Sequence, residues 1–226
     1  MPRPLLVFDM DGVLVEVGDS YRETICRTVA HFTGRQITRE LVATYKNQGG
    51  WNNDWALSHR IAADLGVQVP YDTVIEHFQR LFLGNGDDGL ILRERWIPRP
   101  GLLKQLAATW RLAIFTGRLK SEAGLTLRRF QAESVFDPII GTDDIVNGKP
   151  APDGLLKIAA LHPDRAMWYI GDTVDDARSA RAAGVPFIGV AAGDSHRRGE
   201  LLDLFSAEQA TAVIEDINRL TEVLPQ

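Results

Sequence analysis

Two aspartates, separated by one residue, follow a short apolar run near the start of the chain. The run Leu5-Leu6-Val7-Phe8 leads into Asp9-Met10-Asp11-Gly12. Four apolar residues in a row are typical of a buried parallel strand, and a helix that short would be unusual. Because residues i and i+2 of an extended chain point the same way, both carboxylates should project from the carboxyl end of this strand. That end is where open α/β sheets bind their ligands.

A pair of carboxylates at this spacing favours a bound cation. Two like charges so close repel each other, and the pair would stay half protonated unless a cation held it. Mg²⁺ prefers oxygen ligands and commonly takes one or two carboxylates together with water and substrate phosphate. The alternative interpretation is that Asp9 and Asp11 only cap a turn after the strand. This motif alone leaves both interpretations open.

Two further segments offer groups that suit a phosphate. Thr116-Gly117-Arg118 follows the apolar run 112–115 and presents a hydroxyl and backbone amides to a phosphate-sized anion. Lys149 precedes Pro150 and Pro152, which restrict the backbone and therefore the direction of the ammonium. A held ammonium suits a phosphate or a nucleophilic carboxylate. The plainer alternatives are an ordinary turn and an isolated surface lysine.

A second acidic segment follows the apolar run 167–170. Asp172 comes after this run much as Asp9 comes after the first one, and would supply a second carboxylate to a metal. Asp176 lies one helical turn further on, and Asp175 is an adjacent candidate for the same role. The alternative is that these acids only cap a helix, whose N-terminus favours negative charge.

Strands and helices alternate in the part of the chain that carries most of these motifs. From about residue 98 onward, short apolar runs alternate with helical patterns, which predicts a parallel sheet with right-handed crossovers. Residues 16–97 show mainly helical patterns. We therefore expect a core of residues 1–15 and 98–226 and a separate helical lobe of residues 16–97. Strands are expected at residues 5–8, 112–115, 139–140, 167–170, 187–190 and 212–214.

The order of the four motifs resembles the haloacid dehalogenase superfamily of hydrolases. Residues 136–144 and 148–153 are similar to the subgroup that contains phosphoglycolate phosphatase and β-phosphoglucomutase, and the resemblance covers nearly the whole chain. It implies an α/β fold, with a Rossmann-like parallel sheet core and an inserted all-helical cap domain that sets substrate specificity. The motifs are Asp9 to Gly12, Thr116 to Arg118, Gly148 to Pro150 and Gly171 to Asp176.

The resemblance also implies a role for each motif residue. Asp9 would be the nucleophile that forms an aspartyl-phosphate, and Asp11 the general acid/base that protonates the leaving oxygen and then activates water. Mg²⁺ would be held by Asp9, the backbone carbonyl of Asp11 and Asp172. Asp176 would support the metal through water or through Lys149. Because charge spreads over the phosphoryl oxygens during transfer, Mg²⁺ and Lys149 should carry much of the catalysis.

Thr116, Gly117 and Lys149 would bind the phosphoryl oxygens, and Arg118 is a further candidate for phosphate binding.

The implied activity is Mg²⁺-dependent hydrolysis of a small phosphomonoester. Asp11 argues against carbon–halogen cleavage, because the dehalogenating members resemble this chain elsewhere but lack an acid at that place. The alternatives are a β-phosphoglucomutase-like phosphosugar mutase and a non-catalytic protein that binds a phosphometabolite. Phosphonate cleavage would need a cap lysine, and Lys46 does not lie where one is expected.

Residues 49–55 form the part of the helical lobe that would face the active site in this family. They read Gly-Gly-Trp-Asn-Asn-Asp-Trp, with amides where the mutase pattern has basic groups. We expect Trp51, Asn52 and Asn53 to contact the leaving group, because amides and indoles give directed hydrogen bonds and stacking. The alternative is that Trp51 and Trp55 pack inside the lobe, which is favoured for Trp55.

Composition limits the other functions that the chain can have. With 25 basic and 30 acidic residues among 226, the formal net charge is −5, and no basic footprint for nucleic acid is visible. No apolar run approaches the roughly 18 residues of a membrane span, and the start lacks the apolar core of a signal peptide. We expect a cytoplasmic protein that acts on a small-molecule phosphate ester, as a monomer or homodimer. The single cysteine, Cys26, fits a reducing compartment.

Two loops receive no function from the sequence. Gly84 to Gly89 match the glycine pattern of dinucleotide-binding proteins, but a helix is expected before them where that fingerprint requires a strand. Ser195 to Arg198 are expected to form a surface loop.

Overall fold

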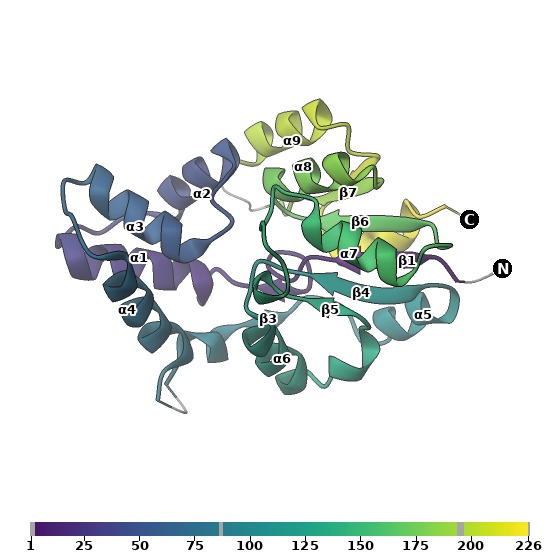
Figure 1. Cartoon of the computed structure of the whole chain (residues 1–226), viewed down its shortest axis with the longest axis horizontal. Helices are drawn as coiled ribbons and strands as arrows, with labels where there is room; N and C mark the ends of the chain where they lie inside the picture. The colour runs from purple at the N-terminus through teal and green to yellow at the C-terminus, as the bar shows by residue number, and fades with distance from the viewer. Residues whose placement is uncertain (1–2, 86–87, 194–196, 226) are drawn as a thin grey trace. The chain divides into compact units, whose positions relative to one another are not determined.

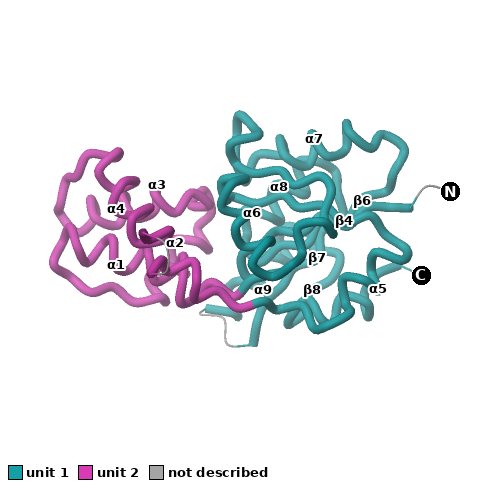
Figure 2. Tube along the Cα trace, turned by 90° about the horizontal axis from the view of Figure 1, so that it is seen from below, with its two compact units in different colours: residues 1–15, 96–226 teal, residues 16–95 magenta. Residues whose placement is uncertain are grey.

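The computed structural model describes residues 3–85, 88–193 and 197–225. The chain divides into two compact units, one formed by Met1–Val15 with Trp96–Gln226 and the other by Glu16–Arg95 (Figure 2). The chain therefore leaves the first unit after the first strand and its acidic turn, and returns to it at Trp96. The expected boundary at residue 98 lies just beyond this point.

The first unit is built on a six-stranded sheet in the order β5-β4-β1-β6-β7-β8, and every neighbouring pair is parallel. Figure 1 shows β1 in this sheet together with β4 and β6, which pair with it on its two sides. This architecture confirms the predicted parallel sheet. The strands are β1 (Leu5–Phe8), β4 (Arg111–Phe115), β5 (Ile139–Ile140), β6 (Met167–Gly171), β7 (Phe187–Val190) and β8 (Ala212–Ile214).

The central strands are buried on both faces, because helices cover both sides of a sheet built with crossover connections. All four residues of β1 are buried. Val7 and Tyr169 pack into a core with Leu155 and Phe205, which lie on helices. Phe8, whose side chain points to the opposite face, packs edge-on against Phe136. The helices of this unit are α5 (Leu102–Thr109), α6 (Lys120–Arg129), α7 (Asp153–Leu161), α8 (Val174–Ala183) and α9 (Arg198–Ala207), with short 3₁₀ turns at Glu133–Val135, Thr142–Asp144 and Ile217–Glu222.

The second unit consists of helices packed around aromatic side chains. Tyr21 stacks at a tilt on Phe82, with ring centroids 4.0 Å apart, and Phe78 lies beside both rings. These three side chains come from the first and fourth helices and join them into one core. The helices are α1 (Tyr21–Thr33), α2 (Arg39–Gln48), α3 (Asp54–Asp64) and α4 (Tyr71–Leu83), followed by the 3₁₀ turn Leu90–Arg93.

Two short strands, β2 (Val15–Glu16) and β3 (Arg95–Trp96), pair with each other where the chain passes from one unit to the other.

Helix α4 ends before Gly84, so a helix does precede the glycine-rich loop, of which residues 86–87 lie outside the described residues. Residues 195–196 of the second loop also lie outside them, and Arg198 is the first residue of α9. Among the helices of the described residues, none combines the length and apolar character needed to cross a membrane.

Candidate active site

The carboxyl end of β1 delivers Asp9 and Asp11 to one edge of the sheet. The backbone N–H of Asp9 donates to the carbonyl of Ile170, so this residue continues the pairing of β1 with β6. The chain then turns through Gly12, whose φ of +72° is a conformation that favours glycine. The Asp9 side chain is 7% exposed and the Asp11 side chain 29% exposed. Asp9 is therefore enclosed, and Asp11 reaches further toward solvent.

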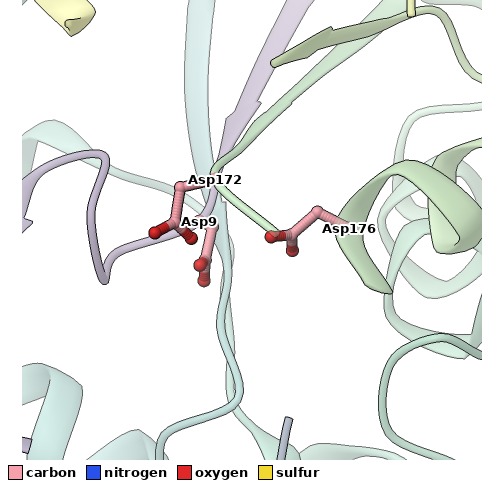
Figure 3. A group of neighbouring side chains, drawn as sticks. All are labelled: Asp9, Asp172 and Asp176. Atoms are coloured by element: carbon pink, nitrogen blue, oxygen red, sulfur yellow. The ribbon is translucent and has the colours of Figure 1, made fainter. Parts of the chain in front are cut away.

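Three carboxylates lie around a common space, those of Asp9 and Asp172 just after β1 and β6 and that of Asp176 on α8. One oxygen each from Asp9, Asp172 and Asp176 lies within 4.8 Å of the others. Figure 3 shows the three side chains as neighbours. A Cβ at Gly12 would collide with the Asp172 carboxylate. The glycine after the acidic pair therefore permits both the turn and the approach of the second acid. This explains the Asp-x-Asp-Gly motif better than simple turn capping does.

Several hydrogen-bond donors surround the carboxylate of Asp176. The hydroxyl of Tyr169 donates to Oδ1 at 2.7 Å. The backbone N–H and the hydroxyl of Thr173 donate to Oδ2 at 3.0 and 2.6 Å. Burial acts to raise the pKa of Asp176, but Lys149 and these hydrogen bonds outweigh it and lower the pKa. Asp176 is therefore a buried carboxylate whose contacts favour support through Lys149 over direct metal ligation.

Lys149 lies between two of the acids. Its Nζ is 2.9 Å from Asp9 Oδ1 and 2.7 Å from Asp176 Oδ1, and its side chain is 1% exposed. The ammonium also lies 4.9 Å from the ring centroid of Phe115 and 5.4 Å from that of Tyr169. Burial acts to lower the pKa of Lys149, but Asp176 and Asp9 outweigh it and raise the pKa. The surface-lysine interpretation is therefore wrong, because this lysine is a buried cation directed at Asp9.

Burial raises the pKa of Asp9 from 3.8 to about 7, with Lys149 opposing the shift and Asp176 and Asp11 adding to it. A further cation beside Asp9 would favour its ionised form, because a nearby positive charge lowers the pKa of a carboxyl group. The oxygen-only donor set of Asp9 and Asp172 suits Mg²⁺, which takes one or two carboxylates alongside water and phosphate. The residues present therefore fit the expected cation.

The Thr116 turn follows β4, the other neighbour of β1. The backbone N–H of Thr116 donates to the carbonyl of Ile140, and its hydroxyl accepts from the backbone N–H of Arg118 at 3.2 Å. Because its oxygen accepts this bond, the hydroxyl hydrogen is available for an acceptor such as a phosphoryl oxygen. The turns after β1, β4 and β6 all lie at the same edge of the sheet, as the parallel strands require.

Arg118 is placed differently from the expectation that it binds phosphate. Its side chain is 1% exposed, and Nε and Nη2 lie 2.7 and 2.5 Å from Asp11 Oδ1. Its Nη1 donates to the Thr126 hydroxyl at 2.8 Å. Sequence reasoning missed this contact with Asp11, since 107 positions separate the two residues and no local pattern connects them.

The cap residues singled out in the sequence belong to the second unit. Asn53 caps α3, because its side-chain oxygen accepts from the backbone N–H of Ala56 at 3.0 Å. Trp51 lies edge-on to Tyr45, with ring centroids 6.2 Å apart, and both Trp51 and Asn52 remain partly exposed. A capping role accounts for Asn53 within its own unit.

Lys46, the residue considered for phosphonate chemistry, is paired within the second unit. Its Nζ lies 2.5 Å from Asp54 Oδ1, and the two side chains are largely buried. The amine is therefore engaged by a carboxylate of its own unit, which is a structural role for this lysine. This contact adds to the argument against phosphonate cleavage.

Known proteins resemble this chain in sequence over most of its length. A family model described as haloacid dehalogenase-like hydrolase matches residues 4–184. An imidazoleglycerol-phosphate dehydratase from Phytophthora nicotianae is 34% identical over 198 residues, which are 84% of this chain but 43% of that protein. This chain thus spans less than half the length of that relative. A phosphoglycolate phosphatase from Mesorhizobium japonicum is 27% identical over 206 residues, which are 87% of this chain and 86% of that protein.

A solved structure resembles the fold over the whole chain. A protein from Haemophilus somnus, described as a predicted phosphoglycolate phosphatase, has a TM-score of 0.78 and 17% identity, and the match covers 99% of this chain and 98% of that one. At this identity the likeness shows the fold alone, and it confirms the expected Rossmann-like sheet core with its helical insertion. The family model rests on the sequence instead, and it shows that this chain belongs to the haloacid dehalogenase-like hydrolases.

Proposed function

We propose that this enzyme is a Mg²⁺-dependent phosphatase that hydrolyses a small phosphomonoester through an aspartyl-phosphate on Asp9. The observation that carries the proposal is the position of Asp9, whose buried carboxylate lies 2.9 Å from Lys149 Nζ and beside Asp172. A carboxylate enclosed with one ammonium and a second acid suits nucleophilic attack on a bound phosphoryl group. Binding alone would not require Asp11 as well.

The reaction would occur in two displacements at phosphorus. Asp9 attacks the phosphorus of the ester, the bond to the ester oxygen breaks, and Asp11 gives its proton to the leaving alcohol. Asp11, now ionised, takes a proton from a water molecule, whose oxygen attacks the phosphorus of the aspartyl-phosphate. The bond between phosphorus and the Asp9 oxygen then breaks, which releases inorganic phosphate and restores both carboxyl groups.

Mg²⁺ would be held by Asp9, Asp172 and the backbone carbonyl of Asp11. When bound, it would neutralise charge on the phosphoryl oxygens and lower the repulsion between those oxygens and the attacking carboxylate. Lys149 adds a fixed positive charge at the same place. Its own position depends on Asp176, to which its Nζ lies at 2.7 Å.

The turn after β4 would bind the remaining phosphoryl oxygens. The Thr116 hydroxyl and the backbone N–H of Gly117 are the donors that we assign to them. The second unit, Glu16–Arg95, would act as the cap that selects the leaving group, with Trp51 and Asn52 as contacts. Because the relative from Mesorhizobium japonicum is a phosphoglycolate phosphatase, 2-phosphoglycolate is the first substrate to test.

The proposal is tested by phosphate release from a panel of phosphomonoesters, with Mg²⁺ and with chelator. The panel includes 2-phosphoglycolate, glycerol 3-phosphate, hexose phosphates and p-nitrophenyl phosphate. Metal-dependent turnover that Asp9→Asn abolishes supports the proposal. Asp137→Asn is the matched control, because that carboxylate is 80% exposed and pairs with Arg111 on the surface. Phosphosugar isomerisation without phosphate release would instead indicate a mutase, and binding without either reaction would indicate a non-catalytic protein.

A further inference from the structure

Arg118 is a buried guanidinium beside the site that the proposed reaction does not yet use. Its side chain is 1% exposed, although it follows the turn that would bind phosphate. Nε and Nη2 both contact Asp11 Oδ1, and Nη1 donates to Thr126 Oγ1. Each of the three guanidinium nitrogens is thus directed at another protein group. This geometry leaves the guanidinium poorly placed to bind a phosphoryl group.

We propose that Arg118 is a positioning residue that holds the Asp11 carboxylate in the orientation needed for proton transfer. The proposal rests on the function proposed above, since it concerns the acid/base of that reaction. It replaces the assignment of Arg118 to phosphate binding.

The two contacts with Asp11 end on the same oxygen, which orients the carboxylate. The Nε of Arg118 donates to Oδ1 at 2.7 Å, and Nη2 lies 2.5 Å from the same oxygen as an ion pair, so Oδ2 is the oxygen left to carry a transferred proton. A carboxylate on a solvent-facing turn would otherwise rotate about its side-chain bonds, and restricting that rotation in advance removes an entropic cost from the proton transfer. Asp11 is 29% exposed, so it depends on such a contact more than the enclosed Asp9 does.

Thr126 fixes the other end of the guanidinium. It is a buried residue of α6, and its hydroxyl accepts from Nη1 at 2.8 Å. Because α6 is a packed helix, this bond ties the position of Arg118 to the framework of the unit. Thr126 on α6 thus holds Arg118, which in turn holds Asp11. Removing the Thr126 hydroxyl should loosen Arg118 without changing Asp11 itself.

Positioning and phosphate binding predict different kinetics. A general acid matters most when the leaving oxygen is a strong base, because a weakly basic oxygen departs without a proton. If Arg118 positions Asp11, its loss should slow the hydrolysis of alkyl phosphates far more than that of p-nitrophenyl phosphate. If Arg118 binds phosphate, its loss should slow the hydrolysis of all esters alike and should weaken inhibition by inorganic phosphate.

The test compares Arg118→Met and Thr126→Val with the wild-type protein, each loaded with Mg²⁺. For Arg118→Met we expect kcat/KM to fall about 100-fold on glycerol 3-phosphate, or on whichever alkyl ester the wild-type protein turns over best, and by less than about fivefold on p-nitrophenyl phosphate. The inhibition constant of inorganic phosphate should stay within about twofold. Thr126→Val should shift the ratio of the kcat/KM values for these two substrates in the same direction, but by a smaller factor. This second variant keeps the proposal testable if Arg118→Met fails to fold. Arg128→Met is the control, since Arg128 lies on α6 with a side chain that is 55% exposed.

A series of aryl phosphates, from the nitrophenyl to the phenyl ester, shows whether Arg118 acts through Asp11. The dependence of kcat/KM on leaving-group basicity should become steeper in Arg118→Met and in Asp11→Asn. Adding Arg118→Met to Asp11→Asn should steepen it no further, because coupled residues are non-additive. Equal losses on all esters, or a tenfold weaker inhibition by phosphate, would overturn the positioning role while leaving the phosphatase proposal intact. A wild-type protein without metal-dependent hydrolysis would instead overturn both.

Discussion

Lys149 and Asp9 form an ion pair that is closed off from solvent. The Nζ to Oδ1 distance is 2.9 Å, and the two side chains are 1% and 7% exposed. Removing water from two charges is costly, and their attraction offsets this only when the remaining hydrogen bonds are also satisfied. Here Asp176 supplies a second carboxylate to the ammonium at 2.7 Å. The pair therefore places a preorganised cation where the charge of a phosphoryl group would develop.

The titration of Asp9 should make the stability of the metal-free protein depend on pH. Burial raises the pKa of Asp9 from 3.8 to about 7, so the folded state binds this proton more tightly than the unfolded chain does. The resulting stabilisation is complete below pH 3.8 and is lost as the pH rises to about 7. Asp9→Asn removes this loss, and its melting temperature should exceed that of the wild-type protein by more at pH 8 than at pH 5.

Differential scanning fluorimetry in chelator measures this effect directly. Adding Mg²⁺ should narrow the difference in melting temperature between Asp9→Asn and the wild-type protein at pH 8, because the cation stabilises the ionised wild-type carboxylate. Asp137→Asn serves as the surface control. A difference in melting temperature that is the same at both pH values would contradict the assignment of the raised pKa to Asp9.

Gly12→Ala should disrupt the metal site as well as strain the turn. Gly12 has a φ of +72°, and an added Cβ would meet the Asp172 carboxylate. The left-handed conformation alone should cost about 1–2 kcal/mol of the free energy of unfolding. Displacement of Asp172 should in addition abolish the rise in melting temperature that Mg²⁺ gives the wild-type protein.

Gly101→Ala separates the two expected effects of Gly12→Ala, which are backbone strain and displacement of Asp172. Gly101 has a φ of +86°, and nothing lies within 4 Å of an added Cβ there. This variant should lose a similar amount of stability but keep its full response to Mg²⁺. Equal Mg²⁺ responses in the two alanine variants would show that Asp172 is not a ligand.

Tyr169→Phe should lower stability and weaken the hold on Lys149. The Tyr169 hydroxyl is buried and donates to Asp176 Oδ1 at 2.7 Å, and the same oxygen lies 2.7 Å from Lys149 Nζ. Losing a buried hydrogen bond to a charged group should cost about 1.5–3 kcal/mol, measured by urea unfolding. Tyr45→Phe is the control, because the Tyr45 hydroxyl donates to Asp64 in an exposed position at the same distance of 2.7 Å. If the two variants lose the same stability, burial of the Tyr169 contact has no energetic consequence.

Trp51→Ala should change which phosphomonoester is preferred while leaving Mg²⁺ dependence unchanged. Trp51 is partly exposed in the second unit and follows two glycines, and the proposed function assigns it to contact with the leaving group. We expect the ratio of kcat/KM values for two substrates of different size to shift about 10-fold, the effect of losing one apolar contact.

Asn53→Ala is the contrast to Trp51→Ala. It removes the N-cap of α3 and should cost about 1 kcal/mol of stability without changing that ratio. An unchanged substrate profile in Trp51→Ala would contradict the specificity role of this segment.

Much of the fold could be predicted because local patterns and sheet topology act together. Short apolar runs separated by helical patterns require parallel strands, and parallel strands carry their following turns to one edge of the sheet. The proximity of Asp9 and Asp172 could be predicted for the same reason, whereas a place for Lys149 beside them was implied only by the family resemblance. The cap segment was harder, because nothing in residues 49–55 shows that Asn53 is already used to begin a helix.

The sequence by itself determined that Asp9 and Asp172 each follow an apolar strand, and a parallel sheet brings such residues to one edge. Only the tertiary structure decided what those groups contact. Because β1 lies between β4 and β6, Arg118 meets Asp11, and Asp176 is surrounded by Tyr169, Thr173 and Lys149. Such contacts depend on side-chain direction and burial, which arise from packing between residues far apart in the chain and leave no local pattern.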